Sequence, residues 1–351
     1  MARRSRMVMK KLLGTIAAVI FCLSATATSA QPVNIWVGFN VGGGFDASAR
    51  IFARYFPKYL PGNPDVIVRN KPGVGSANLL GWMYAQPQTA GFDIALFHPQ
   101  VIQIPLYGKR KFKFKPSGFS YIGNMYTDVG VCAVWRGANQ NIKTFADIKS
   151  AKKPVVFGAA RPSSALSTYP YFLKNVFGAN LRVINGYQSA QQRVQAMERG
   201  ELEGTCQLFE STIKSSFRNK WDAGDFNAFI QIDMGKKSSF FGPNTTLLSS
   251  LIKTEEQRQI AEFVFGIDTM TRPFLASSSL PKENIRILRK AFMATMRDPA
   301  LHRDFQKIFG ITPDPMDGVA VEKFFKNLVA TPKDIVQKAW NITSPSKVKK
   351  K

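Results

Sequence analysis

The chain has 351 residues, of which 45% are hydrophobic and 20% are charged, and 28 of them are Phe. This composition excludes a mainly disordered chain, because disorder requires few aromatic residues and dense charge, and the length favours about two domains. Three Cys are too few for a disulfide scaffold, and two His, His98 and His302, leave little for a His-based metal site. The 48 Lys and Arg exceed the 23 acidic residues and give a net charge of +25, which bears on partners rather than on fold.

Residues 1–30 have the pattern of a secretory signal peptide. Cations at the N-terminus precede the apolar run Leu12–Leu23, and the small residues Thr28-Ser29-Ala30 follow it. A membrane span needs roughly twenty apolar residues, so this run is too short for a retained anchor. We therefore expect cleavage near Ala30 and export of the mature chain. At the other end, residues 341–351 are expected to form a basic tail.

Strands and helices alternate through the first hundred residues. A glycine run at 42–44 separates the first strand from a helix whose apolar residues share one face, and Pro61 and Gly62 end that helix. Such alternation is typical of a parallel α/β sheet. In chain order, the pattern predicts a strand at 33–39, a helix at 45–59, a strand at 65–68, a helix at 77–85 and a strand at 93–97.

A second α/β unit is expected after a basic connector. It begins with one long extended stretch, Tyr121 to Trp135, and continues with strands at 154–158, 181–184 and 205–209 and helices at 141–150, 164–177 and 189–199. The strand 226–232 could rejoin the first unit, and the remainder is predicted to be helical, at 255–265, 282–296, 300–309 and 319–330. The predicted division is domain 1 from 31–110 and 226–340, domain 2 from 111–225, and crossovers near 100–125 and 212–228.

The segment Gly42–Ala47 joins the first strand to the first helix. A glycine turn here would expose backbone N–H groups at the positive end of the helix, which suits an anion such as a carboxylate. The spacing also fits G-x-G-x-x-A, the dinucleotide-binding turn, and Arg69 after the second strand could meet a 2′-phosphate. A tight turn without a ligand is the third interpretation. Export argues against the nucleotide, because free NADP is not expected outside the cell.

Polar residues after neighbouring strands are candidates for the same ligand, because the carboxyl ends of parallel strands meet at one edge of a sheet. Each could equally be a helix cap, a plain turn, or a surface or wall residue. An arginine among them could pair with a carboxylate through two hydrogen bonds. These candidates are Ser76, Asn78, His98, Arg161, Ser163, Ser164, Gln188 and Ser189.

Signatures of catalysis are missing from the sequence. No G-x-S-x-G, G-x-x-x-x-G-K or H-E-x-x-H occurs, so we expect no enzyme activity, no metal and no cofactor. The segment Lys109–Lys115 alternates cations with Phe112 and Phe114, which could stack on single-stranded nucleic acid, although a basic crossover strand explains it as well. Cys132 and Cys206 fall on strands of one predicted domain and could form a disulfide in an oxidising compartment.

Two segments of the chain carry a resemblance to a known family. Residues 42–50, Gly-Gly-Gly-Phe-Asp-Ala-Ser-Ala-Arg, and residues 70–76, Asn-Lys-Pro-Gly-Val-Gly-Ser, resemble the glycine segment and the second loop of the tripartite tricarboxylate transporter substrate-binding proteins, the TctC or Bug family. Less specific matches are Lys143–Ile148, Gly200–Glu203, Leu280-Pro281 and Asp298-Pro299. The resemblance covers nearly all of residues 33–340. Arg161-Pro162 in the second domain and Phe39-Asn40 before the glycine turn depart from the family pattern.

The resemblance implies a two-domain periplasmic-binding-protein (Venus flytrap) fold that closes on a small organic carboxylate. It also implies delivery to membrane permease subunits, although sensing without transport fits equally well, and we expect a monomer that binds no nucleic acid. Glu210 stands where family strands often end in an aspartate. Carried over by motif, the ligand contacts are Gly42, Gly43, Phe45, Asp46, Ser76, Ala77 and Asn78, with Ser163, Ser164, Gln188 and Ser189 in domain 2.

Two other functions stay open on the sequence alone. One is an exported NADP-type reductase that uses the Gly42–Ala47 turn, which a cofactor absorbance band would reveal. The other is a basic nucleic-acid-binding protein, whose affinity should fall steeply with added salt.

Overall fold

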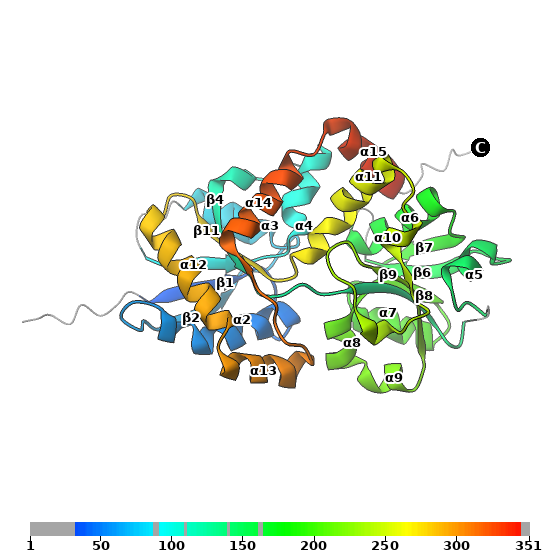
Figure 1. The fold of residues 1–351 in the computed structure, drawn as a ribbon, viewed down its shortest axis with the longest axis horizontal. Helices are drawn as coiled ribbons and strands as arrows, with labels where there is room; N and C mark the ends of the chain where they lie inside the picture. Colours follow the sequence, from blue (N-terminus) through cyan, green and yellow to red (C-terminus); the bar gives the residue numbers. More distant parts are fainter. Residues whose placement is uncertain (1–31, 87–90, 109–110, 139–140, 161–163, 345–351) are drawn as a thin grey trace, which may run out of the picture.

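The computed structural model describes residues 32–86, 91–108, 111–138, 141–160 and 164–344. They form two lobes, each built on a six-stranded sheet (Figure 1). In the first sheet, β1 pairs in parallel with β2 and β3, whereas β11 runs antiparallel to both β3 and β4. Its order is β12-β4-β11-β3-β1-β2, with bounds β1 Val33–Val37, β2 Val66–Asn70, β3 Ile94–Leu96, β4 Phe119–Asn124, β11 Pro273–Ser277 and β12 Met316–Asp317.

The second sheet has the same mixture of directions. Here β6 pairs in parallel with β7 and β8, while β5 runs antiparallel to β8 and β9. Its order is β10-β9-β5-β8-β6-β7, with bounds β5 Gly130–Trp135, β6 Val155–Ala159, β7 Leu181–Asn185, β8 Gly204–Phe209, β9 Phe226–Ile232 and β10 Thr246–Leu247.

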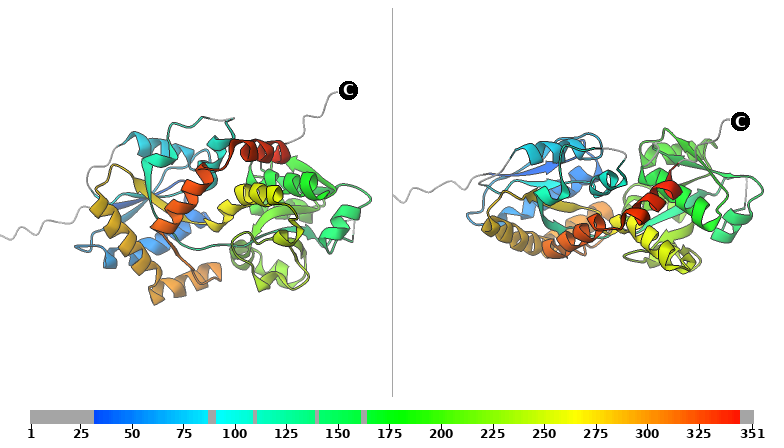
Figure 2. Two further views of the ribbon diagram at one scale, coloured as in Figure 1. Left: turned by 45° about the horizontal axis from the view of Figure 1, so that its top comes forward. Right: turned by 90° about the horizontal axis from the view of Figure 1, so that it is seen from above.

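Helices cover both sheets, and of the last two helices one packs on the first lobe and the other on the second (Figures 1 and 2). α14 packs on β4 of the first sheet, and α15 packs on α6 of the second lobe. The α-helices are α2 Gly44–Tyr55, α3 Ala77–Ala85, α4 Gln100–Gln103, α5 Phe145–Ser150, α6 Ala165–Phe177, α7 Ala190–Glu198, α8 Glu210–Ser216, α9 Arg218–Asp222, α10 Leu248–Leu251, α11 Glu255–Phe265, α12 Lys282–Met296, α13 Pro299–Phe309, α14 Gly318–Val329 and α15 Lys333–Thr343. The short 3-10 helices are Pro57–Tyr59, Ile104–Tyr107, Pro116–Gly118, Ser239–Phe241 and Gly266–Thr269.

Local sequence explains why the elements near the glycine turn form where they do. β1 is apolar at alternate buried positions, which suits a strand packed on one side. In α2, Ile51 and Phe52 are buried while Arg50 is exposed, as the 3.6-residue period of an amphipathic helix requires. Ser189 begins α7 with a capping box in which Gln192 reaches back to the Ser189 backbone, as the sequence predicts for a cap at that position.

Three expectations about organisation are wrong. The extended stretch 121–135 divides into β4 and β5, which belong to different sheets. The strand 226–232 does not rejoin the first unit, because β9 pairs with β5 in the second sheet. The remainder is not purely helical, because β10, β11 and β12 follow. The chain therefore crosses between the lobes at residues 125–129 and 270–272, and again between α14 and α15, not near 100–125 and 212–228.

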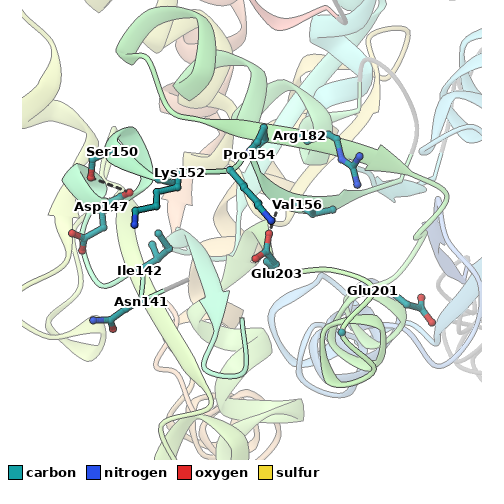
Figure 3. A pocket seen from close by; sticks show the side chains of 13 residues that line it. Asn141, Ile142, Asp147, Ser150, Lys152, Pro154, Val156, Arg182, Glu201 and Glu203 are labelled. Carbon is teal, nitrogen blue, oxygen red and sulfur yellow. Dashed lines mark hydrogen bonds between the residues drawn. The ribbon is translucent and has the colours of Figure 1, made fainter. Parts of the chain in front are cut away.

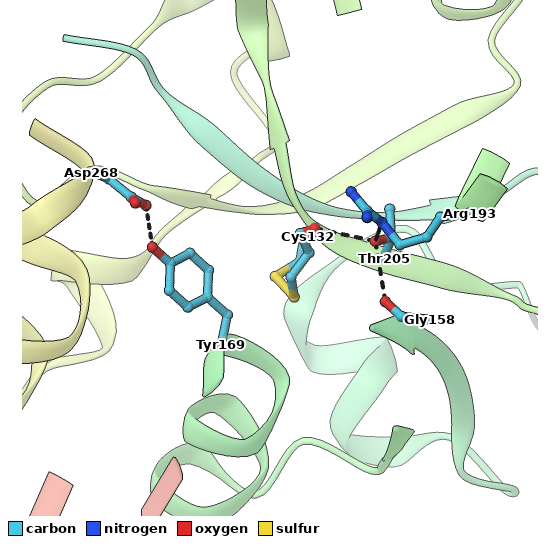
Figure 4. The surroundings of a disulfide bond; sticks show 7 residues. Cys132, Gly158, Tyr169, Arg193, Thr205 and Asp268 are labelled. Carbon is cyan, nitrogen blue, oxygen red and sulfur yellow. Dashed lines mark hydrogen bonds between the residues drawn. A yellow bond between two sulfur atoms is a disulfide. The ribbon is translucent and has the colours of Figure 1, made fainter. Parts of the chain in front are cut away.

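A disulfide joins Cys132 of β5 to Cys206 of β8 and confirms the pairing that the sequence allowed (Figure 4). Both residues are fully buried in the second lobe. Within the described residues, no helix is long and apolar enough to cross a bilayer.

Candidate functional site

The glycine turn leads directly into α2. Gly42, Gly43 and Gly44 are exposed, and α2 begins at Gly44 with Gly43 in an extended conformation at its N-cap. No side chain caps this helix, so the first N–H groups lack the capping partner that most helices provide. Because no Cβ covers the turn, its backbone is open to an anion at the positive end of the helix.

Asp46 holds the turn from within. Its carboxylate accepts hydrogen bonds from the Gly42 N–H at 2.9 Å, from Arg50 Nε at 2.9 Å and from Asn70 Nδ2 at 2.9 Å. Burial raises the pKa of this carboxyl, but the hydrogen bonds from Arg50, Gly42 and Asn70 outweigh burial and leave the pKa below its usual value. The side chain is 2% exposed, so Asp46 shapes the turn, and the predicted direct contact with a ligand stays a prediction.

Three rings gather beside the turn. Phe39 and Phe45 stack with centroids 4.3 Å apart, and the His98 ring lies 6.0 Å from Phe45. The residue expected to follow the third strand, His98, is thus brought to the glycine turn. Its ring also receives a hydrogen bond from the Gln100 N–H at Nδ1, 3.2 Å away.

Arg272 lies at the start of α2 and was not among the residues predicted from the sequence. Its guanidinium carbon is 4.0 Å from the centroid of Phe45 and 5.6 Å from that of Tyr126. A Cβ placed on Gly44 would lie 3.1 Å from Arg272 Nη2. Arg272 directly precedes β11, and an antiparallel strand starts at the edge where its parallel neighbours end. This direction of β11 carries the arginine to the glycine turn.

The second predicted loop is mostly engaged in holding the sheet edge together. Ser76 is fully buried, and its hydroxyl accepts a hydrogen bond from the His98 N–H at 3.1 Å. Ala77 is buried as the first residue of α3, whereas Asn78 is exposed and donates weakly to the Pro72 carbonyl at 3.5 Å. Of the three contacts predicted in this loop, Ser76, Ala77 and Asn78, only Asn78 has an exposed polar side chain.

The domain 2 candidates lie at the carboxyl ends of β6, β7 and β8. Gln188 is exposed and donates to the Ala160 carbonyl at 3.2 Å, and Ser189 caps α7. Ser164 is buried at the start of α6, and Glu210 is paired with Lys214 at 2.6 Å. Arg161 and Ser163 lie outside the described residues. Each of the four described candidates bonds to a neighbour on its own or an adjoining loop or helix, while the glycine turn, His98 and Arg272 form a separate group in the first lobe.

The crossovers at residues 125–129 and 270–272 bond to each other close to Arg272. The Asp128 N–H donates to Thr271 Oγ1 at 2.9 Å, and the Arg272 N–H donates to Asn124 Oδ1 at 2.9 Å. The Asp128 carboxylate accepts from the hydroxyl of Ser211 and from its N–H at 3.3 Å. Burial raises the pKa of Asp128 despite these hydrogen bonds.

Tyr126 and Asp268 extend this buried polar region. The Tyr126 hydroxyl has no hydrogen-bond partner of good geometry among the described residues, and burial raises its pKa. Asp268 accepts a hydrogen bond from the Tyr169 hydroxyl (Figure 4). Burial raises the pKa of Asp268 to about 7, although the Tyr169 hydrogen bond opposes the shift.

A cavity of about 840 Å³ lies at the edge of the second sheet opposite to the one that carries the domain 2 candidates (Figure 3). It is lined by Pro154, Val156 and Arg182, at the amino ends of β6 and β7. Its acids already have partners, since Asp147 caps α5 and Glu203 accepts from the Val156 N–H at 2.8 Å. None of the predicted ligand contacts that fall within the described residues lines it. Among the described residues, no group of three or more His, Cys, Asp or Glu is placed to hold a metal.

Solved structures with the same two-lobed architecture were found by comparison. A TctC solute-binding protein from Polaromonas, without ligand, matches at a TM-score of 0.65 with 19% identity over 89% of this chain and 100% of its own. The periplasmic binding protein BugD matches at a TM-score of 0.63 with 18% identity over 88% and 97% of the two chains. The R. palustris protein Rpa4515 with adipate matches at 0.62 with 13% identity over 88% and 97%.

The chain has the fold of the TctC and Bug periplasmic binding proteins. The Venus flytrap fold expected from the sequence is thereby confirmed, with each lobe built on a mixed sheet. No family model matches the chain, and no curated protein matches it in sequence. The likeness to TctC and Bug proteins therefore stands on the fold.

Proposed function

We propose that this chain is an extracytoplasmic solute-binding protein that holds a small organic carboxylate between its lobes. The observation that carries the proposal is the uncapped, exposed start of α2 at Gly42–Gly44. N–H groups at a helix start attract a negative charge, and charge-assisted hydrogen bonds are worth about 1.5–3 kcal/mol each. The protein of the same fold that was solved with adipate supports a carboxylate as the ligand.

Gly43→Val tests the site because valine would cover the turn without breaking it. Gly43 has φ −84° and ψ 170°, which valine adopts readily, and a Cβ there would come no closer than 3.8 Å to the Asn40 carbonyl oxygen. Gly266→Val is the matched control, because a Cβ at Gly266 also has 3.8 Å of room and would face Phe324 of α14, not the glycine turn.

The ligand is first found by thermal shift with benzoate, succinate, adipate and citrate, because a ligand of the native state raises the melting temperature. Calorimetry with the tightest of these should then show at least about tenfold weaker binding by Gly43→Val, one decade being about 1.4 kcal/mol. Gly266→Val should bind like wild type. Equal affinity in a folded Gly43→Val variant would place the carboxylate elsewhere.

The cellular role belongs to the same proposal. Export rests on the signal-like residues 1–30, and mass spectrometry of the secreted chain should find Gln31 or a neighbour as its first residue. Delivery to permease subunits rests on the family resemblance, with sensing as the other outcome. The missing catalytic signatures support a binding protein that is not an enzyme. A monomer is expected, and light scattering would test it.

A further inference from the structure

Arg272 has no carboxylate partner among the described residues. All 23 acidic residues fall inside the described residues, and none of them forms an ion pair with Arg272. Arg289, which is also partly buried, shows the usual arrangement: it pairs with Glu322 at 2.6 Å and donates to the Tyr121 carbonyl. A partly buried cation without a partner is costly, because desolvation is not repaid.

The donors of Arg272 are largely unused. Nη1 donates to the Thr271 carbonyl at 2.9 Å, while Nε is buried with no acceptor among the described residues. Nη2 donates to no described residue and lies beside Gly44 at the start of α2. Nε and Nη2 belong to one side of the guanidinium, which is the geometry that binds a carboxylate through two hydrogen bonds. Asp128 is close enough for Arg272 to lower its pKa, but its carboxylate is already bonded to Ser211.

The aromatic neighbours fix where this cation stands. One face of the Phe45 ring is covered by Phe39, so Arg272 occupies the other face. Tyr126, which is 1% exposed, flanks the guanidinium at 5.6 Å. The backbone is fixed as well, because Arg272 precedes Pro273, which favours extended geometry, and the Arg272 carbonyl accepts from the Met125 N–H at 3.1 Å. Phe45 is thus a positioning residue whose ring has little free surface for a ligand.

We propose that Arg272 is the charge-selecting residue of the site: its unpaired guanidinium and the N–H groups at the start of α2 receive the same ionised carboxylate of the solute. This inference rests on the proposed function and adds a cation of the first lobe to a site for which the sequence indicated backbone N–H groups, polar side chains and, as its one arginine, Arg161. It follows that the site should discriminate strongly between a carboxylate and its uncharged amide, because the amide leaves the partly buried cation without a partner.

The test compares variants that remove one guanidinium each. Arg272→Gln is measured against Arg69→Gln, because Arg69 also stacks on an aromatic ring, that of Trp36 at 5.8 Å, and is exposed on β2. Each variant is titrated by calorimetry with the tightest carboxylate of the panel and with the corresponding amide. We expect Arg272→Gln to bind the carboxylate about 10- to 100-fold more weakly and to lose most of the preference over the amide. Arg69→Gln should keep both.

Two further variants protect the test against misfolding. Arg272→Lys keeps the charge but lacks the planar fork, so an intermediate loss is expected. Gly44→Ala places a methyl group 3.1 Å from Nη2 and should weaken binding with Arg272 intact. Gly81→Ala, at a helical glycine where a Cβ would meet only Lys113 at an ordinary contact distance of 3.9 Å, should not. Melting temperatures confirm that each variant is folded.

The outcomes separate the two proposals. A wild-type protein that binds none of the carboxylates contradicts the proposed function, and the assignment of Arg272 falls with it. The other outcome is that the wild-type protein binds a carboxylate and the folded Arg272→Gln and Gly44→Ala variants bind it equally well, with the same discrimination against the amide. That outcome contradicts only the assignment of Arg272 and leaves the proposed function standing.

Discussion

Removal of the Cys132–Cys206 disulfide should destabilise the second lobe. The bond joins residues 74 apart in the sequence, and closing a loop of that length lowers the entropy of the unfolded chain. The chain-entropy relation gives about 15 cal/mol/K, or about 4.5 kcal/mol at 25 °C. With a urea slope of about 2 kcal/mol/M, the denaturation midpoint should fall by roughly 2 M.

The assay is equilibrium urea unfolding of the mature chain, oxidised or refolded under reducing agent and followed by circular dichroism. The mature chain starting at Gln31 keeps only these two of the three cysteines, so no other thiol contributes. A Cys132→Ala, Cys206→Ala double variant is the control, and reducing agent should leave its midpoint unchanged. Coincident midpoints for the oxidised and reduced wild type would refute the reasoning from loop closure.

Asp268 and Asp46 should make the free energy of unfolding depend on pH in opposite directions. Because the pKa of Asp268 is raised to about 7, the folded state holds a proton that the unfolded state has lost. The free energy of unfolding should therefore fall as pH rises from about 4 to 7, by at most about 1.4 kcal/mol per unit, and Asp268→Asn should remove this slope in urea titrations. Asp46 has a lowered pKa, so its contribution is present above about pH 4 and is lost as pH falls further. Asp46→Ala should cost about 2–3 kcal/mol at pH 7, because Gly42 and Asn70 lose their acceptor, and Asp46→Asn should cost less.

The sequence predicted the first α/β segment well because its signals are local. The glycine run, the apolar face of α2 and the proline after it mark a strand, a turn and a helix without reference to the rest of the chain. The long C-terminal helices α11 and α12 were also predicted at their observed bounds, because their apolar residues recur with the helical period.

Long-range pairing was beyond the sequence pattern. Periodicity shows that 226–232 is a strand but not which sheet it joins, and the residues of β5 with which it pairs lie 91 to 102 positions earlier in the chain. For the same reason, the sequence did not predict that Arg272 lies at the glycine turn. Its place at the glycine turn depends on β11 entering the first sheet antiparallel, beside strands made long before it. A polar residue directly before a short apolar strand, followed by Pro273, was the only local signal.

The position of β11 also decides the order in which the lobes can form. In the first sheet, β11 lies between β3 and β4, so these strands have no hydrogen-bonded connection without it. The second sheet is built from one uninterrupted stretch of chain, from β5 to β10. A chain that emerges from its N-terminus therefore completes the sheet of the later lobe first, because the first sheet cannot join β3 to β4 until β11 has emerged at residue 277. During that interval the apolar strands β3 and β4, which lack β11 between them, are exposed and can aggregate. A protein truncated before β11 should leave these strands exposed permanently.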